Sequence, residues 1–209
     1  MMIEAQAKTA SEQTRARLLA AAREVFSQHS FQGATVREIC RRAEANVAAV
    51  NYHFGSKDGL LAEALNFASL AALQKANVKA DACPRKRLRL FIRDFMLMLL
   101  DEKNPSSQCR IMARELADPT PALDKIVREA IAPLHKFLGE LVREIVGGQV
   151  SETDLRRYVH SILGQCLFYR HSQPVLQRLR PGLRYDHEEI EAIAEHIADF
   201  SLAGLERHL

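Results

Sequence analysis

The stretch GATVREICRRAEANVAAVNYHFGSK, from Gly33 to Lys57, constrains the fold more than any other part of the chain. Within it, Thr35 precedes Glu38 by three residues, the spacing of a capping box. In this motif the hydroxyl accepts from a free backbone N–H while the carboxylate returns to the amide of the cap. Apolar residues then recur at intervals of three and four, as on one face of a helix: Val36, Ile39, Cys40 and Ala43. A short helix is therefore expected after Thr35.

A second short helix is expected after a turn at residues 44–46. Val47, Val50 and Phe54 recur at i, i+3 and i+7, so they are predicted to share its buried face. Its other face then carries small, polar and aromatic residues: Ala48, Ala49, Asn51, Tyr52 and His53. Two short helices at this spacing are typical of a helix-turn-helix.

The exposed face of this second helix has the chemistry needed to bind a DNA duplex. Ala48 and Ala49 would let the backbone approach base edges in the major groove, and Asn51 could pair with an adenine. Tyr52 and His53 can donate hydrogen bonds to phosphate oxygens. The same pattern also occurs in helical proteins that bind no DNA, so periodicity alone leaves both interpretations open.

Two further residues lie at expected helix starts, where free backbone N–H groups favour an anion. Thr35 begins the first of the two short helices, and Lys57 lies at the start of the helix that follows them. Both are therefore candidates for contacts with the phosphate backbone.

The run from Thr14 to Leu65 resembles the DNA-binding domain of the TetR/AcrR family of bacterial repressors. The resemblance rests on the segments TRARLLAAAREVFSQHSF, GATVREI and NYHFGSKDGLL. It implies three amino-terminal helices that bind operator DNA, a long fourth helix, and a larger helical domain that binds an effector and dimerises. The family's DNA contacts would fall on Thr35, Ala48, Ala49, Asn51, Tyr52, His53 and Lys57. Asn51 stands where the family more often has a tyrosine, which leaves the division between base and phosphate contacts open.

The predicted fold class is all-α, with residues 1–56 as the DNA-binding domain and residues 57–209 as the helical effector-binding and dimerisation domain. The predicted function is that of a ligand-responsive transcriptional regulator, a repressor released from a palindromic operator by a small lipophilic or drug-like effector. The alternative is an architectural or effector-free DNA-binding module. An enzyme is not expected.

The boundaries of the first and fourth helices follow from local signals. Residues 1–13 are expected to form a flexible arm, and the first helix is expected to run over residues 14–28. Ser56 is a candidate cap for a fourth helix that continues to about Val78, a rod of roughly 30 Å. Such a rod could transmit movement between the domains.

Residues 84–100 read PRKRLRLFIRDFMLMLL. The basic residues at the start could face a nucleic acid or water, and a solvated helix face is the expectation, because charge runs usually face solvent. The later part is apolar almost all round and must be buried. Further on, Thr120 and Pro121 are expected to be the cap and the first residue of another helix.

Pro133 lies inside an otherwise helical pattern, where proline removes a backbone hydrogen bond and clashes with the preceding turn. A kink or break is therefore expected near Ile131. Such a kink would spread neighbouring helices and open an effector cavity. The predicted lining is Phe95, Met98, Met112, Glu115, Leu138, Gln165 and Phe168. Any one of these side chains could equally belong to the core, although Glu115 and Gln165 fit a dry core least well.

Two longer helices are expected near the carboxy terminus, at about residues 152–171 and 187–207. The second carries apolar residues on more than one face, so it needs a partner. The family resemblance implies a homodimer in which the last two helices of each protomer form a four-helix bundle. The segment SILGQCLFYRHSQP is also similar to the branch with a CecR-type carboxy-terminal domain.

The sequence contains no nucleophile elbow, glycine-rich phosphate loop or HExxH motif, so no enzyme, cofactor or metal site is predicted. Four scattered cysteines, Cys40, Cys83, Cys109 and Cys166, favour reduced thiols. With 29 basic and 26 acidic residues the net charge is only +3, so specific DNA binding would depend on groove contacts at two half-sites. A cytoplasmic protein without membrane contact is expected, because no signal peptide or long apolar run is present.

Overall fold

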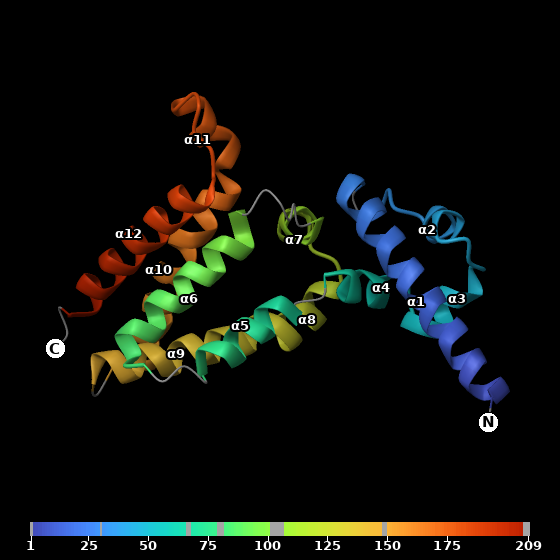
Figure 1. Cartoon of the computed structure of the whole chain (residues 1–209), viewed down its shortest axis with the longest axis horizontal. Coiled ribbons are helices and arrows are strands. Elements are labelled where there is room, and N and C mark those ends of the chain that lie inside the picture. The colour runs from blue at the N-terminus through green and yellow to red at the C-terminus, as the bar shows by residue number, and fades with distance from the viewer. Residues whose placement is uncertain are drawn as a thin grey trace. The chain divides into compact units, whose positions relative to one another are not determined.

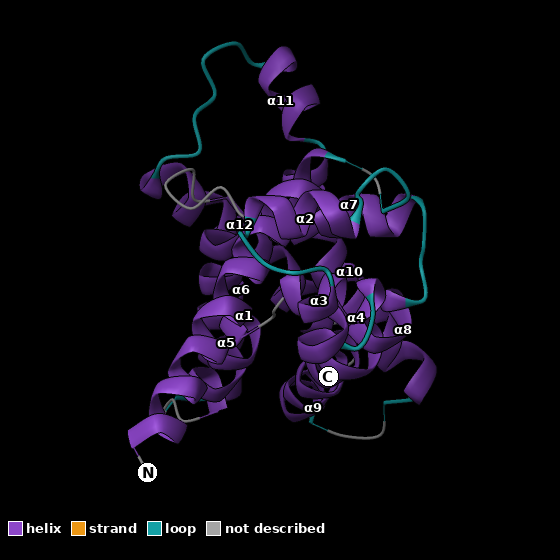
Figure 2. Cartoon of the chain, turned by 90° about the vertical axis from the view of Figure 1, so that its right-hand side faces the viewer, coloured by secondary structure: helices purple, strands orange, loops and turns teal. Residues whose placement is uncertain are grey.

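The computed structural model describes residues 2–29, 31–65, 68–78, 82–100, 107–147 and 150–206. Within these ranges every regular element is a helix and no strand occurs, which confirms the predicted all-α class (Figure 2). In the same ranges, no helix combines the length and the apolar run needed to cross a bilayer.

The chain forms two compact units (Figure 1). Unit 1 comprises residues 1–66 and 106–128, and unit 2 comprises residues 67–105 and 129–209. The units differ from the domains expected at 1–56 and 57–209. The reason is packing, since residues 106–128 supply two helices that contact the amino-terminal ones.

Unit 1 is built around α1 (Met2–Gln28), which contacts the helices that follow it. These are α2 (Val36–Arg42), α3 (Ala48–Phe54), α4 (Lys57–Ala64) and α7 (Ser107–Ala117), with α8 (Ala122–Ile126) on α4. The apolar residues of α1 that face its neighbours are buried: Leu18, Ala22, Val25 and Phe26. The helix begins at Met2 and not near Thr14, so the expected boundary is wrong. Alanine and other good helix formers before Thr14 extend the helical backbone.

Two arginines of α1 stabilise the ends of neighbouring helices. Arg17 Nε donates to the carbonyl of Ala43 at the end of α2 (3.0 Å), and Arg23 Nε donates to the carbonyl of Ala64 at the end of α4 (3.2 Å). Cations suit these positions, because the last carbonyls of a helix lack partners and carry partial negative charge. Part of the basic charge of unit 1 therefore holds the fold together.

The predicted fourth helix is not one continuous rod. Ser56 caps α4 as expected, since its Oγ accepts from the Gly59 N–H at 3.0 Å. The helix ends at Ala64, however, and Leu65 adopts φ −76° and ψ 9° beyond it. A separate helix, α5 (Ala68–Val78), follows in unit 2. The expected 30 Å rod is therefore wrong, because the boundary between the units falls inside it.

Unit 2 packs α6 (Pro84–Leu100) against α12 (His187–Glu206), α5 and α9 (Ala132–Val146). α10 (Glu152–His171) contacts α6, α9 and α12, and the short α11 (Gln173–Leu179) follows it with no buried residue. Most of the apolar part of α6 is buried as predicted, including Phe91, Ile92, Phe95 and Leu99, whereas Leu97 and Met98 are half-buried.

The basic start of α6 binds acidic residues of two neighbouring helices. Arg85 pairs with Glu206 of α12, and Arg87 Nη1 lies 2.8 Å from Glu144 Oε2 of α9. Arg89 pairs with Glu195 and Asp199, one turn apart on α12. The segment lies on a partly exposed helix face, as expected, and its arginines pair there with acids of the same chain. The charge run attaches α12 to α6.

Pro133 interrupts its helix as predicted. The chain leaves α8 through a π-helical turn, η1 (Val127–Ile131), and α9 starts directly after it. Pro133 has no N–H for the carbonyl of Glu129 and its ring crowds that turn, which favours the wider hydrogen-bonding pattern. The boundary between units 1 and 2 lies in this turn, between Arg128 and Glu129.

Candidate nucleic-acid interface

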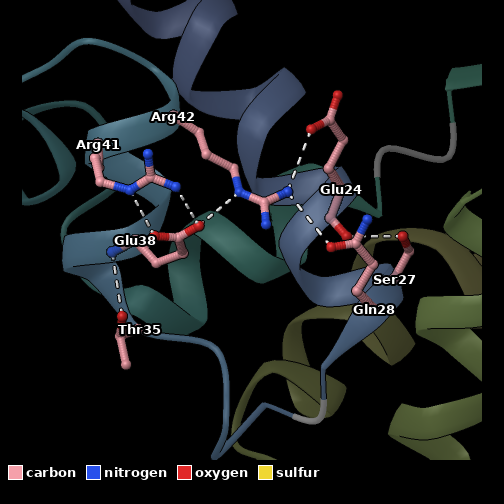
Figure 3. Close-up of polar contacts among 7 residues, drawn as sticks. All are labelled: Glu24, Ser27, Gln28, Thr35, Glu38, Arg41 and Arg42. Atoms are coloured by element: carbon pink, nitrogen blue, oxygen red, sulfur yellow. Dashed lines mark hydrogen bonds and ion pairs between the residues drawn. The ribbon is translucent and has the colours of Figure 1, made fainter.

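α2 begins at the predicted cap. Thr35 Oγ1 accepts from the backbone N–H of Glu38 at 3.1 Å (Figure 3). The Glu38 carboxylate does not complete the capping box, because it accepts from Arg41 and Arg42 at 2.8 Å. The hydrogen bond from Arg41, then that from Arg42, lowers the pKa of the Glu38 carboxyl to about 2. The predicted return of Glu38 to the cap amide is wrong, since two guanidinium groups offer charge-assisted hydrogen bonds.

Arg42 also holds α2 against α1. Its Nη1 donates to Gln28 Oε1 at 3.4 Å and lies 3.5 Å from Glu24 Oε2 (Figure 3). With the bond to Glu38, one guanidinium thus joins α2 to two residues near the end of α1. This arrangement fixes the direction in which α2 leaves the loop before it.

The turn between α2 and α3 is built from residues whose roles periodicity did not reveal. Glu44 adopts φ +49°, the left-handed conformation that reverses the chain after Ala43. Asn46 Oδ1 then accepts from the Ala48 N–H at 2.9 Å and so caps α3. An asparagine two residues before a helix was the available signal for this cap.

α3 presents the predicted outer face, with one correction on its inner face. Val50 and Phe54 are buried as expected, but Val47 is 50% exposed and therefore was wrongly assigned to the core. It lies before the first turn of α3, where the helix periodicity does not yet hold. Tyr52 is 80% exposed, and its ring meets that of His53 edge-on at 4.8 Å.

Two glycines set the exit from α3. Gly55 has φ +74°, which L side chains rarely adopt. Gly59 approaches the end of α3 so closely that a Cβ would lie 2.1 Å from the Phe54 carbonyl oxygen. Both glycines of the GSKDG segment are therefore required sterically, because α4 turns tightly back on α3 after Phe54.

The seven predicted DNA contacts fall into two groups. Thr35 is exposed at the start of α2. On α3, Ala48, Asn51 and Tyr52 are exposed, and Ala49 and His53 are partly exposed. Lys57 differs from the expectation, because its ammonium donates to the Phe31 carbonyl and lies 4.1 Å from the Phe31 ring centroid. Burial lowers the pKa of Lys57. This lysine holds the loop before α2 and does not point freely to solvent.

Arg37 is a candidate contact that sequence reasoning missed. It is exposed in the first turn of α2, next to the cap residue Thr35. No residue in the described part of the chain pairs with its guanidinium, in contrast to Arg41 and Arg42. The signal was available, since a basic residue outside the apolar stripe of α2 must face solvent or a partner.

The predicted effector-binding residues are divided between the two units. Phe95 and Leu138 are buried in the core of unit 2, where Phe95 stacks on Phe91 with centroids 5.5 Å apart. Gln165 Nε2 donates to Ser201 Oγ at 3.2 Å and so joins α10 to α12.

The remaining members of that set also separate. Met98 is half-buried and Phe168 is 53% exposed in unit 2, whereas Met112 and Glu115 belong to α7 of unit 1. Glu115 is buried and accepts from the N–H and Oγ1 of Thr120, at 2.8 Å and 2.7 Å. Core packing therefore accounts for the burial of Phe95 and Leu138. Hydrogen bonds account for the positions of Gln165 and Glu115.

α10 and α12 share an exposed face of small and aromatic residues. Phe168 and Phe200 are more than half exposed, although both are large and apolar. A Cβ added at Gly164 or at Gly204 would meet no atom within 4 Å. The apolar residues predicted on the other sides of α12, such as Ile197, are buried within the protomer.

Two family models match separate segments of the chain, and the first match ends and the second begins at a helix boundary. Residues 18–64 match the model of bacterial regulatory proteins of the tetR family, and this match ends at the last residue of α4. Residues 84–205 match the carboxy-terminal domain of the HTH-type transcriptional dual regulator CecR. The second match covers α6 to α12.

Whole proteins similar to the chain are also regulators. CecR of Shigella flexneri is 27% identical over 209 residues, which cover 93% of each chain. A transcriptional regulator from Pseudomonas aeruginosa PAO1 has the same fold, with a TM-score of 0.70, 23% identity and 95% of each chain covered. So has FadR of Bacillus subtilis in complex with stearoyl-CoA, with a TM-score of 0.69, 16% identity, and 90% of this chain and 97% of that one covered.

Proposed function

Because the chain belongs to the TetR family of bacterial transcriptional regulators and carries the carboxy-terminal domain of the CecR branch, we propose that it is a homodimeric, ligand-responsive regulator that binds a palindromic operator. The observation that carries the proposal is the outer face of α3, which is small, polar and aromatic and is held by local caps. The proposed partner is chromosomal DNA, so the regulator is expected to act in the cytoplasm. No catalytic step is part of the proposal.

The proposed reading face consists of Val47, Ala48, Ala49, Asn51 and Tyr52, with His53 beside them. Small residues at the leading end of α3 allow close approach to base edges, and the exposed Val47 adds methyl groups for contact with thymine. Asn51 is the proposed adenine reader, since its amide can both donate to and accept from that base.

Phosphate contacts are proposed for Tyr52, His53, Thr35 and Arg37. The Thr35 hydroxyl accepts from Glu38 but can still donate its own hydrogen to a phosphate oxygen. Arg37 is proposed to supply the positive charge for a phosphate contact, because the Lys57 ammonium donates to the Phe31 carbonyl. The proposed role of Lys57 is therefore to position the loop that leads to Thr35.

The face of α10 and α12 is the proposed dimer interface. Its exposed phenylalanines, Phe168 and Phe200, gain by leaving water, and its glycines let a second protomer approach closely. Two protomers would place two copies of α3 in successive major grooves, about 34–36 Å apart. Sedimentation velocity tests this part: Gly164→Glu is expected to give monomers, and Arg156→Glu on the α9 side of α10 is the control.

Specific binding is tested by selecting duplexes from a random library and measuring affinity by fluorescence anisotropy. Asn51→Ala is expected to lose about 1–3 kcal/mol per half-site and to relax preference at one base pair. Arg37→Ala is expected to weaken all sequences alike and to reduce the salt dependence. Leu179→Ala, an exposed apolar residue of α11, is the matched control. Selection without a consensus, or unchanged affinity of Asn51→Ala, contradicts the proposal.

The effector is proposed to be small and lipophilic or drug-like, and to release the operator. FadR of Bacillus subtilis in complex with stearoyl-CoA supports a lipophilic ligand for this fold. Met98 and Gln165 of unit 2 stay candidates for contact, because they are half-buried. A compound that binds the native state must raise the melting temperature. The CecR relative is named a dual regulator, so transcription should be measured in both directions with and without such a compound.

A further inference from the structure

A cleft of about 470 Å³ lies within unit 1, between the end of α1, the segment that leads to α2, and α7. Its volume falls in the range typical of small-molecule sites. Apolar side chains from four parts of the unit line it: Phe26, Phe31, Leu61 and Ile111. Ordinary core packing does not fill this space, so a ligand can enter it.

One buried acid lies among the lining residues. Glu115 is only 3% exposed, whereas the other ionisable lining residues, His29, Arg114 and Asp118, are exposed at the surface. A carboxylate in apolar surroundings is costly without a partner, and an oppositely charged group offsets that cost. Glu115 is therefore the acidic side chain on the inner side of the cleft.

Glu115 has hydrogen-bonding capacity left for a ligand. Its Oε1 accepts from the N–H and the hydroxyl of Thr120. No partner for Oε2 occurs in the described part of the chain, and an ionised carboxylate offers about four acceptor sites. The geometry thus leaves one oxygen for a donor that comes from the cleft.

The aromatic lining favours a ligand with an apolar body. The rings of Phe26 and Phe31 are stacked with centroids 6.2 Å apart and planes at 14°, and the Lys57 ammonium lies over the Phe31 ring. Because Phe26 and Lys57 already contact the Phe31 ring, the lining supplies apolar contact, and the charge of a ligand must be met by Glu115. A ligand with an apolar body and a positive charge therefore matches both the walls and Glu115.

We propose that this cleft binds an organic cation with an aromatic body, such as an aryl-alkyl ammonium, with the ammonium on Glu115 Oε2. The consequence for regulation rests on the proposed function. Phe31 and Gly33 precede the cap residue Thr35, so occupancy changes the start of α2. Glu115 also reaches the start of α8, because Thr120 Oγ1 accepts from the Ala122 N–H at 3.2 Å. A ligand here acts directly on the DNA-binding helices.

Three probes with one body and different charges test the site in the full-length protein without DNA. These are 4-phenylbutylammonium, 4-phenylbutan-1-ol and 4-phenylbutyrate, titrated by calorimetry and by ¹H–¹⁵N spectra. The ammonium is expected to bind at least about tenfold more tightly than the alcohol, as for one charge-assisted hydrogen bond. Its shift changes should map to residues 28–33 and 111–118. The butyrate is expected to bind most weakly.

Glu115→Gln is the decisive variant, because its amide oxygen can still accept from Thr120 while the charge is gone. It should remove the preference for the ammonium and leave binding of the alcohol unchanged. Asp118→Asn, at an exposed lining residue, is the matched control and should keep the preference. Equal affinities for the three probes, no saturable binding, or shift changes elsewhere overturn the proposal. The shift map of the unsubstituted protein decides the matter even if Glu115→Gln fails to fold.

A last measurement separates this inference from the proposed function. Anisotropy with a selected duplex should show that 4-phenylbutylammonium changes the DNA affinity of the unsubstituted protein and not that of Glu115→Gln. If the duplex binds but the ammonium does not, the cleft proposal fails and the regulator remains. If the ammonium binds but no duplex is selected, the site remains and the regulator fails. Binding of both without mutual influence overturns the regulatory role of the cleft.

Discussion

The two candidate surfaces, the α3 face in unit 1 and the α10/α12 face in unit 2, are positioned in different ways. Caps two or three residues away set α3 and its neighbours, as in the bond from the Ala48 N–H to Asn46. The α10/α12 face depends on partners far apart in the chain, as in the bond from Gln165 to Ser201. Local hydrogen bonds leave signatures in short stretches of sequence, and long-range ones do not. Local caps can therefore be predicted from short stretches of sequence, and the long-range bonds between α10 and α12 cannot.

The basic residues show the same contrast. In unit 1, Arg17 and Arg23 bind helix-end carbonyls, which any helix offers. In unit 2, Arg89 needs two particular acids on α12, more than a hundred residues away in the chain. A basic residue is thus a poor guide to nucleic-acid binding until its partners are known.

The largest effects are expected from core truncations, which test whether the two units are separate cooperative bodies. Ile39 of α2 and Leu138 of α9 are fully buried. Ile39→Ala and Leu138→Ala should each cost about 2–5 kcal/mol, from lost transfer energy and a residual cavity. Urea unfolding gives the size, and hydrogen exchange read by mass spectrometry gives the location. Faster exchange of α9 and α10 in Ile39→Ala would show that the units unfold together.

Removal of a local cap comes next in size. Asn46→Ala should cost about 1 kcal/mol, because it leaves the Ala48 N–H without its acceptor. Asn46→Asp keeps an oxygen in the same place and is the control. Thermal unfolding followed by circular dichroism measures both. A loss in Asn46→Asp equal to that in Asn46→Ala would mean that the side-chain oxygen does not position α3.

Long-range ion pairs should contribute less than the caps. Arg89 is partly exposed and Asp199 is exposed, so water and salt screen their attraction. A double-mutant cycle with Arg89→Ala and Asp199→Ala should give a coupling of about 0.2–1 kcal/mol at low salt. The coupling should fall in about 1 M NaCl. A coupling energy that exceeds the cost of removing the Asn46 cap and does not change with salt would mean that this long-range ion pair contributes more than a local cap.

The smallest effect concerns the Glu38 carboxyl, whose pKa is lowered to about 2 by hydrogen bonds from Arg41 and Arg42. Because the folded-state pKa is below the usual value of 4.5, this group stabilises the fold above that value. The contribution is lost as the pH falls from 4.5 toward 2. Carboxyl ¹³C shifts should follow this titration, and Arg41→Gln should raise the pKa. A midpoint near 4.5 in the unsubstituted protein would refute the pairing.

The two wrong helix boundaries have different physical origins, since helix propensity before Thr14 extends α1 and tertiary packing ends α4. α1 was expected to start at Thr14 and a single helix to run from Ser56 to Val78, yet the structure starts α1 at Met2 and ends α4 at Ala64. Helix propensity and periodicity respond to a few neighbouring residues. Where a helix stops depends on what it packs against, here on the separation into two compact units.

The sequence by itself determined the all-α class, the caps at Thr35 and Ser56, the buried stripes, and the interruption before Pro133. Each of these depends on backbone geometry and on neighbours within about one or two helical turns. Tertiary structure alone decided that Glu38 binds two arginines, that Lys57 serves a loop carbonyl, and that α7 packs on α1. These outcomes join residues distant in the chain or choose among competing partners. Distance and burial make that choice, and neither can be read from spacing.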